Sequence, residues 1–208
     1  MPADIAPEAD PATILEAIPG LTAPQFRTLK ASDLGRVIFV EAQEGWYVLR
    51  LPAHRGLGIN REVELAIHQA MAAEGLAPAV VWANPVSGAL LTPWQRGGVW
   101  RKDPCTGKDL EALGRLLRRV HGLAVDAPRI SYEARLKGYL ASAATHFDPV
   151  AMVPLRSAVT DLVHYILSTD ECPGLCHHDP LRPNIVCDKS EPIFIDWEYA
   201  AAGGSDNR

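Results

Sequence analysis

Near its carboxyl end the chain reads Cys176-His177-His178-Asp179-Pro180-Leu181-Arg182-Pro183-Asn184-Ile185-Val186 and then, after a polar link, Pro192-Ile193-Phe194-Ile195-Asp196-Trp197-Glu198-Tyr199-Ala200. This stretch contains Asp179, Asn184 five positions later, and Asp196 directly after an apolar run. A carboxylate can align a hydroxyl group and take its proton, and carboxylate and amide oxygens are ligands that Mg²⁺ prefers. We therefore expect Asp179 to act on a hydroxyl group, and Asn184 and Asp196 to hold Mg²⁺ beside a nucleotide.

Two apolar runs, Ile185-Val186 and Ile193-Phe194-Ile195, flank the polar residues 188–191. This pattern predicts two short strands joined by a turn. Such a hairpin would aim Asn184 and Asp196 at one pocket. An H-x-D pattern with a later Asn is loose enough to arise by chance, but the apolar strands and the closing Asp-Trp-Glu argue against chance here.

The motif H-x-D-x-x-x-x-N followed by I-D-W-E-Y-A resembles the catalytic loop and the metal-binding aspartate of the aminoglycoside phosphotransferase and choline/ethanolamine kinase family. Members of this family are small-molecule kinases with a protein-kinase-like fold. The ending I-D-x-E-Y-A resembles the choline/ethanolamine and thiamine kinase branch more closely. The resemblance extends from about Leu21 to Ala200, and its most specific motifs lie at the end of that range.

The resemblance implies an α+β, two-lobed, protein-kinase-like fold. Residues 1–92 would form an amino-terminal lobe, a small antiparallel sheet with one helix that covers the nucleotide. Residues 93–208 would form a mainly helical carboxy-terminal lobe with the catalytic loop and the metal-binding hairpin. Family members normally continue with several more helices, whereas this chain ends twelve residues after Asp196. We therefore expect a truncated carboxy-terminal lobe or a fragment, either of which bears on activity.

The apolar periodicity of the chain agrees with this division. Alternation and turn residues predict strands at 26–29, 36–40, 46–51, 79–82 and 88–92. Apolar residues at three- and four-residue steps predict helices at 12–18, 60–74, 108–122, 132–146 and 150–168. The helix at 108–122 carries an apolar stripe of Leu110, Leu113, Leu117 and Val120, with Leu116 beside it. The stripe of the helix at 150–168 is expected in the core: Leu155, Val159, Leu162, Val163 and Ile166.

The resemblance also implies which residues of the amino-terminal lobe bind the nucleotide: Ser32, Gly35, Arg50, Glu64, Thr92 and Trp94. The first two lie in the turn that covers the phosphates, where relatives carry more glycine. Arg50 would reach the phosphates, because its planar fork suits phosphate oxygens. Glu64, three residues after Arg61, would pair with Arg50. The last two would lie at the hinge, where backbone groups meet the adenine.

Other residues of the carboxy-terminal motifs also have expected roles. His177 is expected to order the catalytic loop by hydrogen bonding to nearby backbone. Arg182 would contact phosphate or pair with an acidic residue, and Glu198 would support the metal or line a cation pocket. Trp197 and Tyr199 are the aromatic faces available to a quaternary ammonium group.

Composition limits the classes of function. The chain has 208 residues, of which 48% are hydrophobic and 22% charged, an ordinary balance for a globular protein. The formal net charge of -5 argues against a nucleic-acid partner and is compatible with a cationic substrate. No stretch approaches the ~20 apolar residues of a membrane span, and the amino terminus lacks a signal-peptide pattern, so we expect a cytoplasmic protein without a membrane partner.

The four cysteines, Cys105, Cys172, Cys176 and Cys187, are expected to be reduced thiols. The C-x-x-x-C-H-H run at 172–178 is not a usual zinc spacing and lacks a second ligand pair, which argues against a structural zinc site.

These features predict an ATP-dependent kinase that uses Mg²⁺ and phosphorylates the hydroxyl group of a small molecule, with choline, ethanolamine or a related amino alcohol as the first expectation. An aminoglycoside, another antibiotic or thiamine are alternative acceptors. An alternative of another class is a non-catalytic nucleotide-binding module or an inactive fragment, which the glycine-poor turn and the short carboxyl end favour. A metal hydrolase built on His177, His178 and Asp179 is the weakest alternative, because we find no further ligands at metal spacing.

Overall fold

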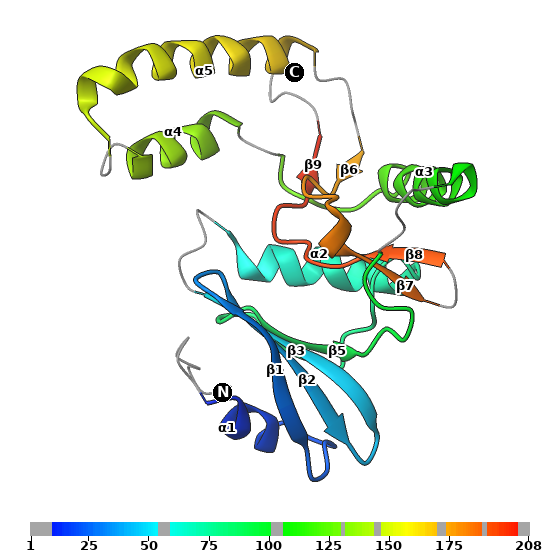
Figure 1. Ribbon diagram of the computed structural model, residues 1–208. Coiled ribbons are helices and arrows are strands. Elements are labelled where there is room, and N and C mark those ends of the chain that lie inside the picture. Colours follow the sequence, from blue (N-terminus) through cyan, green and yellow to red (C-terminus); the bar gives the residue numbers. More distant parts are fainter. Residues whose placement is uncertain are drawn as a thin grey trace.

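The computed structural model describes residues 10–53, 59–100, 106–129, 132–143, 147–169, 174–188 and 191–203. The first part of the chain forms a five-stranded antiparallel sheet in the order β1-β2-β3-β5-β4 (Figure 1). Its strands are β1 (Gln25–Ser32), β2 (Gly35–Ala42), β3 (Gly45–Pro52), β4 (Trp82–Asn84) and β5 (Ala89–Pro93). A small antiparallel sheet followed by a mainly helical part agrees with the predicted α+β fold.

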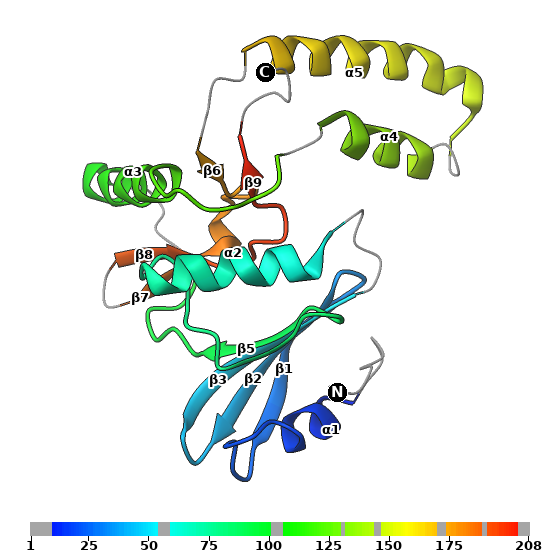
Figure 2. The same ribbon diagram turned by 180° about the vertical axis from the view of Figure 1, so that it is seen from behind.

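Alternation along the strands gives the sheet two different faces. Ile38 and Leu49 are fully buried on one face, where the short helix α1 (Pro11–Glu16) packs Leu15 against them. The next residue along β3, Arg50, points to the opposite face and reaches helix α2. The two helices accordingly lie on opposite sides of the sheet (Figures 1 and 2).

Helix α2 (Arg61–Ala73) joins the sheet to the rest of the molecule. Asn60 caps its start, because its Oδ1 accepts hydrogen bonds from the N–H groups of Glu62 and Val63. Gly75, with φ of 67°, follows its last turn in the left-handed region. The apolar side of α2 packs into one cluster with the carboxy-terminal elements, which includes the buried residues Ile67, Met71, Leu116, Phe194 and Trp197.

The carboxy-terminal part contains three long helices, α3 (Gly107–His121), α4 (Tyr132–Ala143) and α5 (Pro149–Thr169), and the 3₁₀ helix η1 (Arg182–Asn184). Two small antiparallel sheets accompany them: β6 (Leu175–Cys176) with β9 (Ala201–Ala202), and β7 (Ile185–Asp188) with β8 (Glu191–Phe194). α4 and α5 form a helical pair on the far side of α2 from the five-stranded sheet (Figures 1 and 2).

The segment after β5 binds directly to the β7–β8 hairpin. Trp100 N donates to Ile185 O at 2.8 Å, and Cys187 N donates to Gly98 O at 3.0 Å. Gly97 approaches so closely that a Cβ atom there would lie 2.5 Å from the carbonyl oxygen of Cys187. The connection between the sheet and the helical part is therefore packed on the predicted metal-binding hairpin.

The fourth strand differs from the prediction of 79–82, since β4 spans Trp82–Asn84. Asn84 Oδ1 accepts hydrogen bonds from Val86 N and Ser87 N, both at 3.0 Å, and so closes the turn to β5. Pairing starts at this turn, with Asn84 opposite Ala89. The residues nearest the turn therefore form the strand, and of the β-branched residues before them Val81 adds one further hydrogen bond, from its N to Leu91 O at 2.9 Å.

The predicted apolar stripe of α3 is only partly buried. Leu110 is 60% exposed, whereas Leu116 is 3% exposed and lies in the cluster with α2. Leu110 belongs to the first turn of α3. The α2 cluster instead takes in Leu113, Leu116, Leu117 and Val120 from the later turns.

The core prediction for α5 is partly wrong. Leu155 and Leu162 are 48% and 55% exposed, and the buried residues are Met152 and Val163. Met152 and Val163 are eleven positions apart, about three helical turns, so they lie on the same side of the helix. The side chain of Ile166 lies outside the described part.

Some predictions concern residues outside the described ranges: residues 144–146 at the end of a predicted helix, residues 189–190 of the hairpin turn, Cys105 and Cys172. Cys176 and Cys187 are present as thiols. None of the helices in the described ranges is long and apolar enough to cross a membrane. The boundary between lobes at residues 92 and 93 remains a prediction.

Candidate active site

His177 holds the loop that leads from β6 to η1. Its side chain is buried, and its ring centroid lies 4.6 Å from those of Phe194 and Trp197. Nδ1 accepts a hydrogen bond from Asp179 N at 3.3 Å, and Nε2 donates to Ile195 O at 3.0 Å. Burial lowers the pKa of His177 to about 4. The ring is therefore neutral at pH 7, and its two partners assign the proton to Nε2.

Asp179 and Asn184 contact each other directly. Asn184 Nδ2 donates to Asp179 Oδ2 at 2.7 Å and to the carbonyl oxygen of Asp179 at 3.1 Å. The turn between them is closed by hydrogen bonds from Leu181 N to Asp179 O and from Asn184 N to Leu181 O, both at 2.8 Å. Because the amide nitrogen of Asn184 is committed to Asp179, its Oδ1 is the atom that can accept a donor or a cation.

Asp196 follows β8 in the left-handed backbone region, with φ of 67°, which is uncommon for a residue other than glycine. The preceding Ile195 N donates to Asn184 O at 2.9 Å and ties this segment to the loop that carries Asp179 and Asn184. Burial raises the pKa of Asp196 to about 6, while the charge of Arg50 opposes the rise. Asp196 Oδ1 is buried and accepts no hydrogen bond, although Arg50 Nη2 lies 3.0 Å away.

Two arginines and two glutamates form a set of ion pairs, which we call the ionic cluster: Arg50 of β3, Arg61 and Glu64 of α2, and Glu198 between β8 and β9. Arg50 pairs with Glu64 through Nη1, and its Nη2 lies 2.7 Å from Glu198 Oε2. Arg61 Nη1 lies 2.6 Å from Glu64 Oε2 and 3.0 Å from Glu198 Oε2. The predicted contact of Arg50 with Glu64 is present, and each arginine contacts both glutamates.

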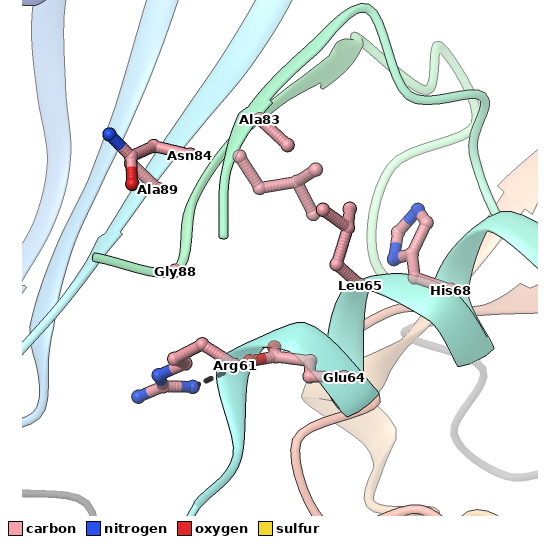
Figure 3. Close-up of a pocket in the computed structure, with 9 residues that line it drawn as sticks. Arg61, Glu64, Leu65, His68, Ala83, Asn84, Gly88 and Ala89 are labelled. Carbon is pink, nitrogen blue, oxygen red and sulfur yellow. Dashed lines mark hydrogen bonds and ion pairs between the residues drawn. The ribbon is translucent and has the colours of Figure 1, made fainter. Parts of the chain in front are cut away.

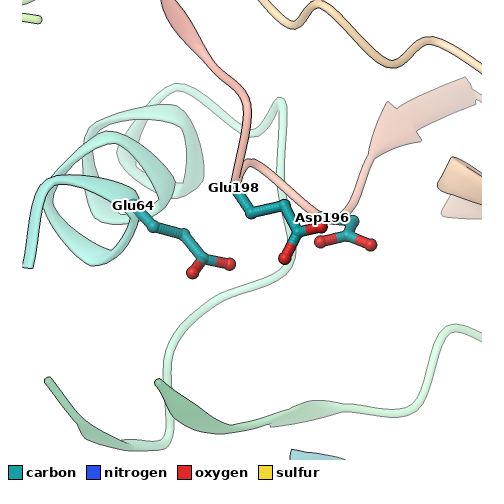
Figure 4. Close-up of side chains that lie close together, drawn as sticks. All are labelled: Glu64, Asp196 and Glu198. Atoms are coloured by element: carbon teal, nitrogen blue, oxygen red, sulfur yellow. The ribbon is translucent and has the colours of Figure 1, made fainter. Parts of the chain in front are cut away.

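The carboxylates dominate the charge around Arg50. Burial disfavours its charged form, but the charges of Asp196, Glu64 and Glu198 raise the pKa of Arg50 above its ordinary value. Oxygens of these three acidic residues all lie within 4.8 Å of one another (Figure 4). Carboxylate oxygens are hard donors that suit Mg²⁺. Of the predicted metal ligands, Asp196 and Glu198 belong to this group, and Asn184 adjoins it through its bond to Ile195.

Arg61 is held in place by the β4–β5 turn. Gly88 has φ of 73°, and a Cβ atom there would lie 2.5 Å from Arg61 Cδ and 2.8 Å from Arg61 Nε. Arg61, Glu64, His68 and Asn84 line a small pocket between α2 and these strands (Figure 3). The prediction from sequence considered Arg61 only as the residue that picks out Glu64 as the partner of Arg50. The three-residue spacing of Arg61 and Glu64 was itself a signal for an ion pair on one helix face, and the role of Arg61 was missed.

The predicted phosphate turn is a tight hairpin turn. Ser32 Oγ accepts a hydrogen bond at 3.3 Å from a backbone N–H inside the turn. Gly35 has φ of 129°, and a Cβ atom there would collide with the carbonyl oxygen of Leu51. Glycine is thus needed by the hairpin itself. Gly35 pairs with Pro52, two residues beyond Arg50, so the turn lies at that end of β3.

Thr92 and Trp94 lie at and just beyond the end of β5. Trp94 N donates to Trp46 O at 2.9 Å, and the Trp94 ring packs edge-on against Phe39 at 5.2 Å between centroids. Both predicted hinge residues are half-buried. Arg182, the other predicted phosphate contact, begins η1 and has an exposed side chain.

The two aromatic faces predicted for a cationic substrate are already occupied. Trp197 is 1% exposed and packs on His177 and Phe194, because the segment after β8 directs it into the core. The guanidinium of Arg135 lies 4.8 Å from the ring centroid of Tyr199, and its Nη2 donates to Tyr199 O at 3.4 Å. The expectation that Trp197 is available was therefore wrong, and the half-buried Tyr199 ring already has a cation 4.8 Å from its centroid.

Comparison with known proteins gives a family and a fold. Residues 27–203 match the model of a family described as the phosphotransferase enzyme family. A search of curated proteins finds no match.

Solved structures resemble the chain over most of its length. A choline/ethanolamine kinase family protein from Mesorhizobium loti is 25% identical, with a TM-score of 0.68 over 93% of this chain and 65% of that one. A Plasmodium vivax ethanolamine kinase is 17% identical, with a TM-score of 0.69 over 90% of this chain and 59% of that one. The streptomycin–ATP complex of APH(2")-IIa is 15% identical, with a TM-score of 0.64 over 93% of this chain and 71% of that one. The kinase-like two-lobed fold is thereby confirmed, and the chain spans less than two thirds of the first two proteins.

Proposed function

Because the chain belongs to the phosphotransferase enzyme family, we propose that it transfers the γ-phosphoryl group of ATP to a hydroxyl group of a small molecule. The observation that carries this proposal is the pair of Asp179 and Asn184, joined at 2.7 Å and tied through Ile195 to Asp196. A carboxylate suited to take a proton is thus hydrogen-bonded to one side chain suited to hold a divalent cation, and a backbone hydrogen bond ties the segment of the second such side chain, Asp196, to the same loop.

The donor set fits a magnesium ion. Asp196 Oδ1 is buried and accepts no hydrogen bond, although the Arg50 guanidinium lies 3.0 Å away, and the contact between Asn184 and Asp179 uses the amide nitrogen rather than the amide oxygen. These two oxygens would hold Mg²⁺, and Glu198 lies beside them as a further acidic residue. When bound, Mg²⁺ offsets the negative charge of the ATP phosphates during transfer.

The residues around the cation have separate tasks in this proposal. Asp179 accepts the proton of the acceptor hydroxyl, and Asn184 fixes one of its oxygens, so that the other can face the substrate. His177 does not take part in proton transfer, because Asp179 N and Ile195 O occupy its two nitrogens. Arg50 binds phosphate oxygens with its planar fork.

The nucleotide would lie between the sheet and the catalytic loop. The turn of Ser32 and Gly35 would cover its phosphates, and the backbone near Thr92 and Trp94 would contact the adenine. Arg182 would approach the phosphates from η1.

We propose choline, ethanolamine or a related amino alcohol as the acceptor. The excess of carboxylates near the site attracts a cation, and a structure named as a choline/ethanolamine kinase family protein is 25% identical. Occupied aromatic rings at Trp197 and Tyr199 support recognition by charge more than by an aromatic cage. Aminoglycosides, other antibiotics and thiamine remain alternative acceptors.

A non-catalytic nucleotide-binding module is the second candidate. One observation favours it: the single glycine of the β1–β2 turn is needed for the hairpin, which leaves the turn little freedom to wrap phosphates. Such a module would bind Mg-ATP and transfer nothing.

Consumption of ATP with choline, ethanolamine, thiamine and aminoglycosides tests the proposal, with Asp179→Ala as the matched variant. We expect turnover with one class of acceptor, background turnover in Asp179→Ala, and the same thermal midpoint for both proteins, since Asp179 is half-buried and not in the core. Mg-ATP binding without turnover on any acceptor would select the non-catalytic module. Equal turnover by Asp179→Ala would contradict the assigned role of that residue.

A further inference from the structure

We propose that Arg61 is a positioning residue for nucleotide binding, an inference that rests on the proposed function. Arg61 is the first residue of α2, and one of its nitrogens, Nη1, contacts Glu64 Oε2 and Glu198 Oε2 at 2.6 and 3.0 Å. Arg61 and Glu64 share one helix, whereas Glu198 belongs to the segment that carries Asp196. Arg61 therefore joins the helix of the amino-terminal lobe to the proposed metal-binding segment.

The charges of the site explain why a second arginine is needed there. Without Arg61, a single cation, Arg50, would face the carboxylates of Glu64, Asp196 and Glu198. These side chains are only 7–31% exposed, so solvent screens their repulsion weakly. Arg61 compensates the negative charges of Glu64 and Glu198, so these two carboxylates attract Arg50 less strongly. Arg50 can then contact a phosphate ligand and release Asp196.

The chain also fixes the position of Arg61. The side chain passes over Gly88, where any Cβ atom would displace it (Figure 3). Gly88 is in the left-handed region and closes the turn between β4 and β5. The glycine therefore leaves room for the Arg61 side chain to reach Glu198.

The geometry predicts that lysine can replace Arg61 but not Arg50. Arg61 uses one nitrogen for both contacts, so the single ammonium group of lysine can replace it. Arg50 uses Nη1 for Glu64 and Nη2 for Asp196 and Glu198, so lysine cannot reproduce its contacts. The two arginines are thus distinguishable by the same conservative change.

Calorimetric binding of a non-hydrolysable ATP analogue with Mg²⁺ tests the proposal. The proteins are the parent, Arg61→Met, Arg61→Lys and Arg50→Lys, with Arg115→Met as a control for loss of charge at an exposed arginine whose ion pair is 4.0 Å long. We expect Arg61→Met to weaken binding about tenfold and Arg61→Lys to stay within about threefold of the parent. Arg50→Lys should bind at least as weakly as Arg61→Met, and Arg115→Met should match the parent.

Gly88→Ala gives a second route to the same result, because it displaces the Arg61 side chain without removing its charge. Gly75→Ala, at φ of 67° with no atom within 4 Å, is the matched control for the backbone strain of alanine at a positive φ. We expect Gly88→Ala to weaken binding, and to add nothing further in the Arg61→Met background. This second variant keeps the test valid if Arg61→Met folds poorly.

Three results overturn the proposal. Binding by Arg61→Met equal to that of the parent would overturn this inference and leave the proposed function intact, and so would a defect in Arg61→Lys as large as in Arg61→Met. A parent protein that binds no Mg²⁺–analogue complex would overturn the proposed function and this inference together.

Discussion

Asn184 offers two different atoms to the site, and substitution can separate them. Its nitrogen fixes Asp179, and its oxygen is the proposed ligand of Mg²⁺. Asn184→Asp keeps an oxygen ligand but removes the N–H donor and places a like charge beside Asp179. We expect Mg²⁺ affinity equal to or above that of the parent, with kcat lower by about a hundredfold or more, the effect of losing an oriented general base. Titration calorimetry and steady-state kinetics measure the two quantities, and unchanged kcat would contradict the assigned pair.

His177 makes the fold sensitive to acid. The pKa of His177 is lowered by burial from 6.5 to about 4, so the folded protein binds fewer protons than the unfolded chain between these pH values. The contribution of His177 to the free energy of unfolding is therefore fully present above pH 6.5. It falls by an amount on the order of 3 kcal/mol as the pH drops to 4. Urea unfolding at several pH values measures it, with chelator present. His177→Phe should be less stable at pH 7 and should lose this part of the slope.

Asp196 provides an independent check on the pH dependence of stability, because its pKa is shifted in the opposite direction from that of His177. Its pKa rises from 3.8 to about 6, so the folded protein binds more protons than the unfolded chain in that window. Its contribution favours folding as the pH falls below 6 and opposes the effect of His177. Asp196→Asn should therefore lose stability more steeply on acidification than the parent. Because both proteins contain His177, a shallower slope in Asp196→Asn would contradict the sign of the Asp196 shift.

Among the structural elements, those with local signals could be predicted from the sequence. The β7–β8 hairpin follows from two apolar runs around a polar turn, and Glu64 follows from its spacing to Arg61. The contact between Arg61 and Glu198 joins residues 137 positions apart, and no local period encodes such a distance. The two-residue pairing of β6 with β9 is too short to leave a pattern. The exposure of Leu110 depends on where neighbouring elements end, which periodicity cannot show.

Adding one methyl group tests how closely the segment after β5 packs on β7. In Gly97→Ala the new Cβ atom would lie 2.5 Å from Cys187 O and 2.6 Å from Cys187 Cβ. We expect a loss of about 1–3 kcal/mol, as for other overpacked contacts, with faster hydrogen exchange at Cys187 N. Gly114→Ala is the matched control, because it meets no atom within 4 Å inside α3 and should be neutral or stabilising. Equal effects of the two substitutions would show that the close approach is not a constraint.

The two lobes share one core, so the molecule should unfold as a unit. Met71 of α2 is fully buried in the same cluster as Leu116 of α3 and Phe194 of β8. Met71→Ala leaves a cavity between the lobes, and we expect it to lower the free energy of unfolding by about 2–5 kcal/mol. Hydrogen exchange should speed up together in α2 and in the β7–β8 hairpin, because neither surface can stay covered without the other. Leu15→Ala, in the separate cluster of α1 and the outer sheet face, is the comparison. Two resolved transitions in Met71→Ala, with the β7–β8 hairpin still protected after α2 has opened, would show that this hairpin is stable without the amino-terminal lobe.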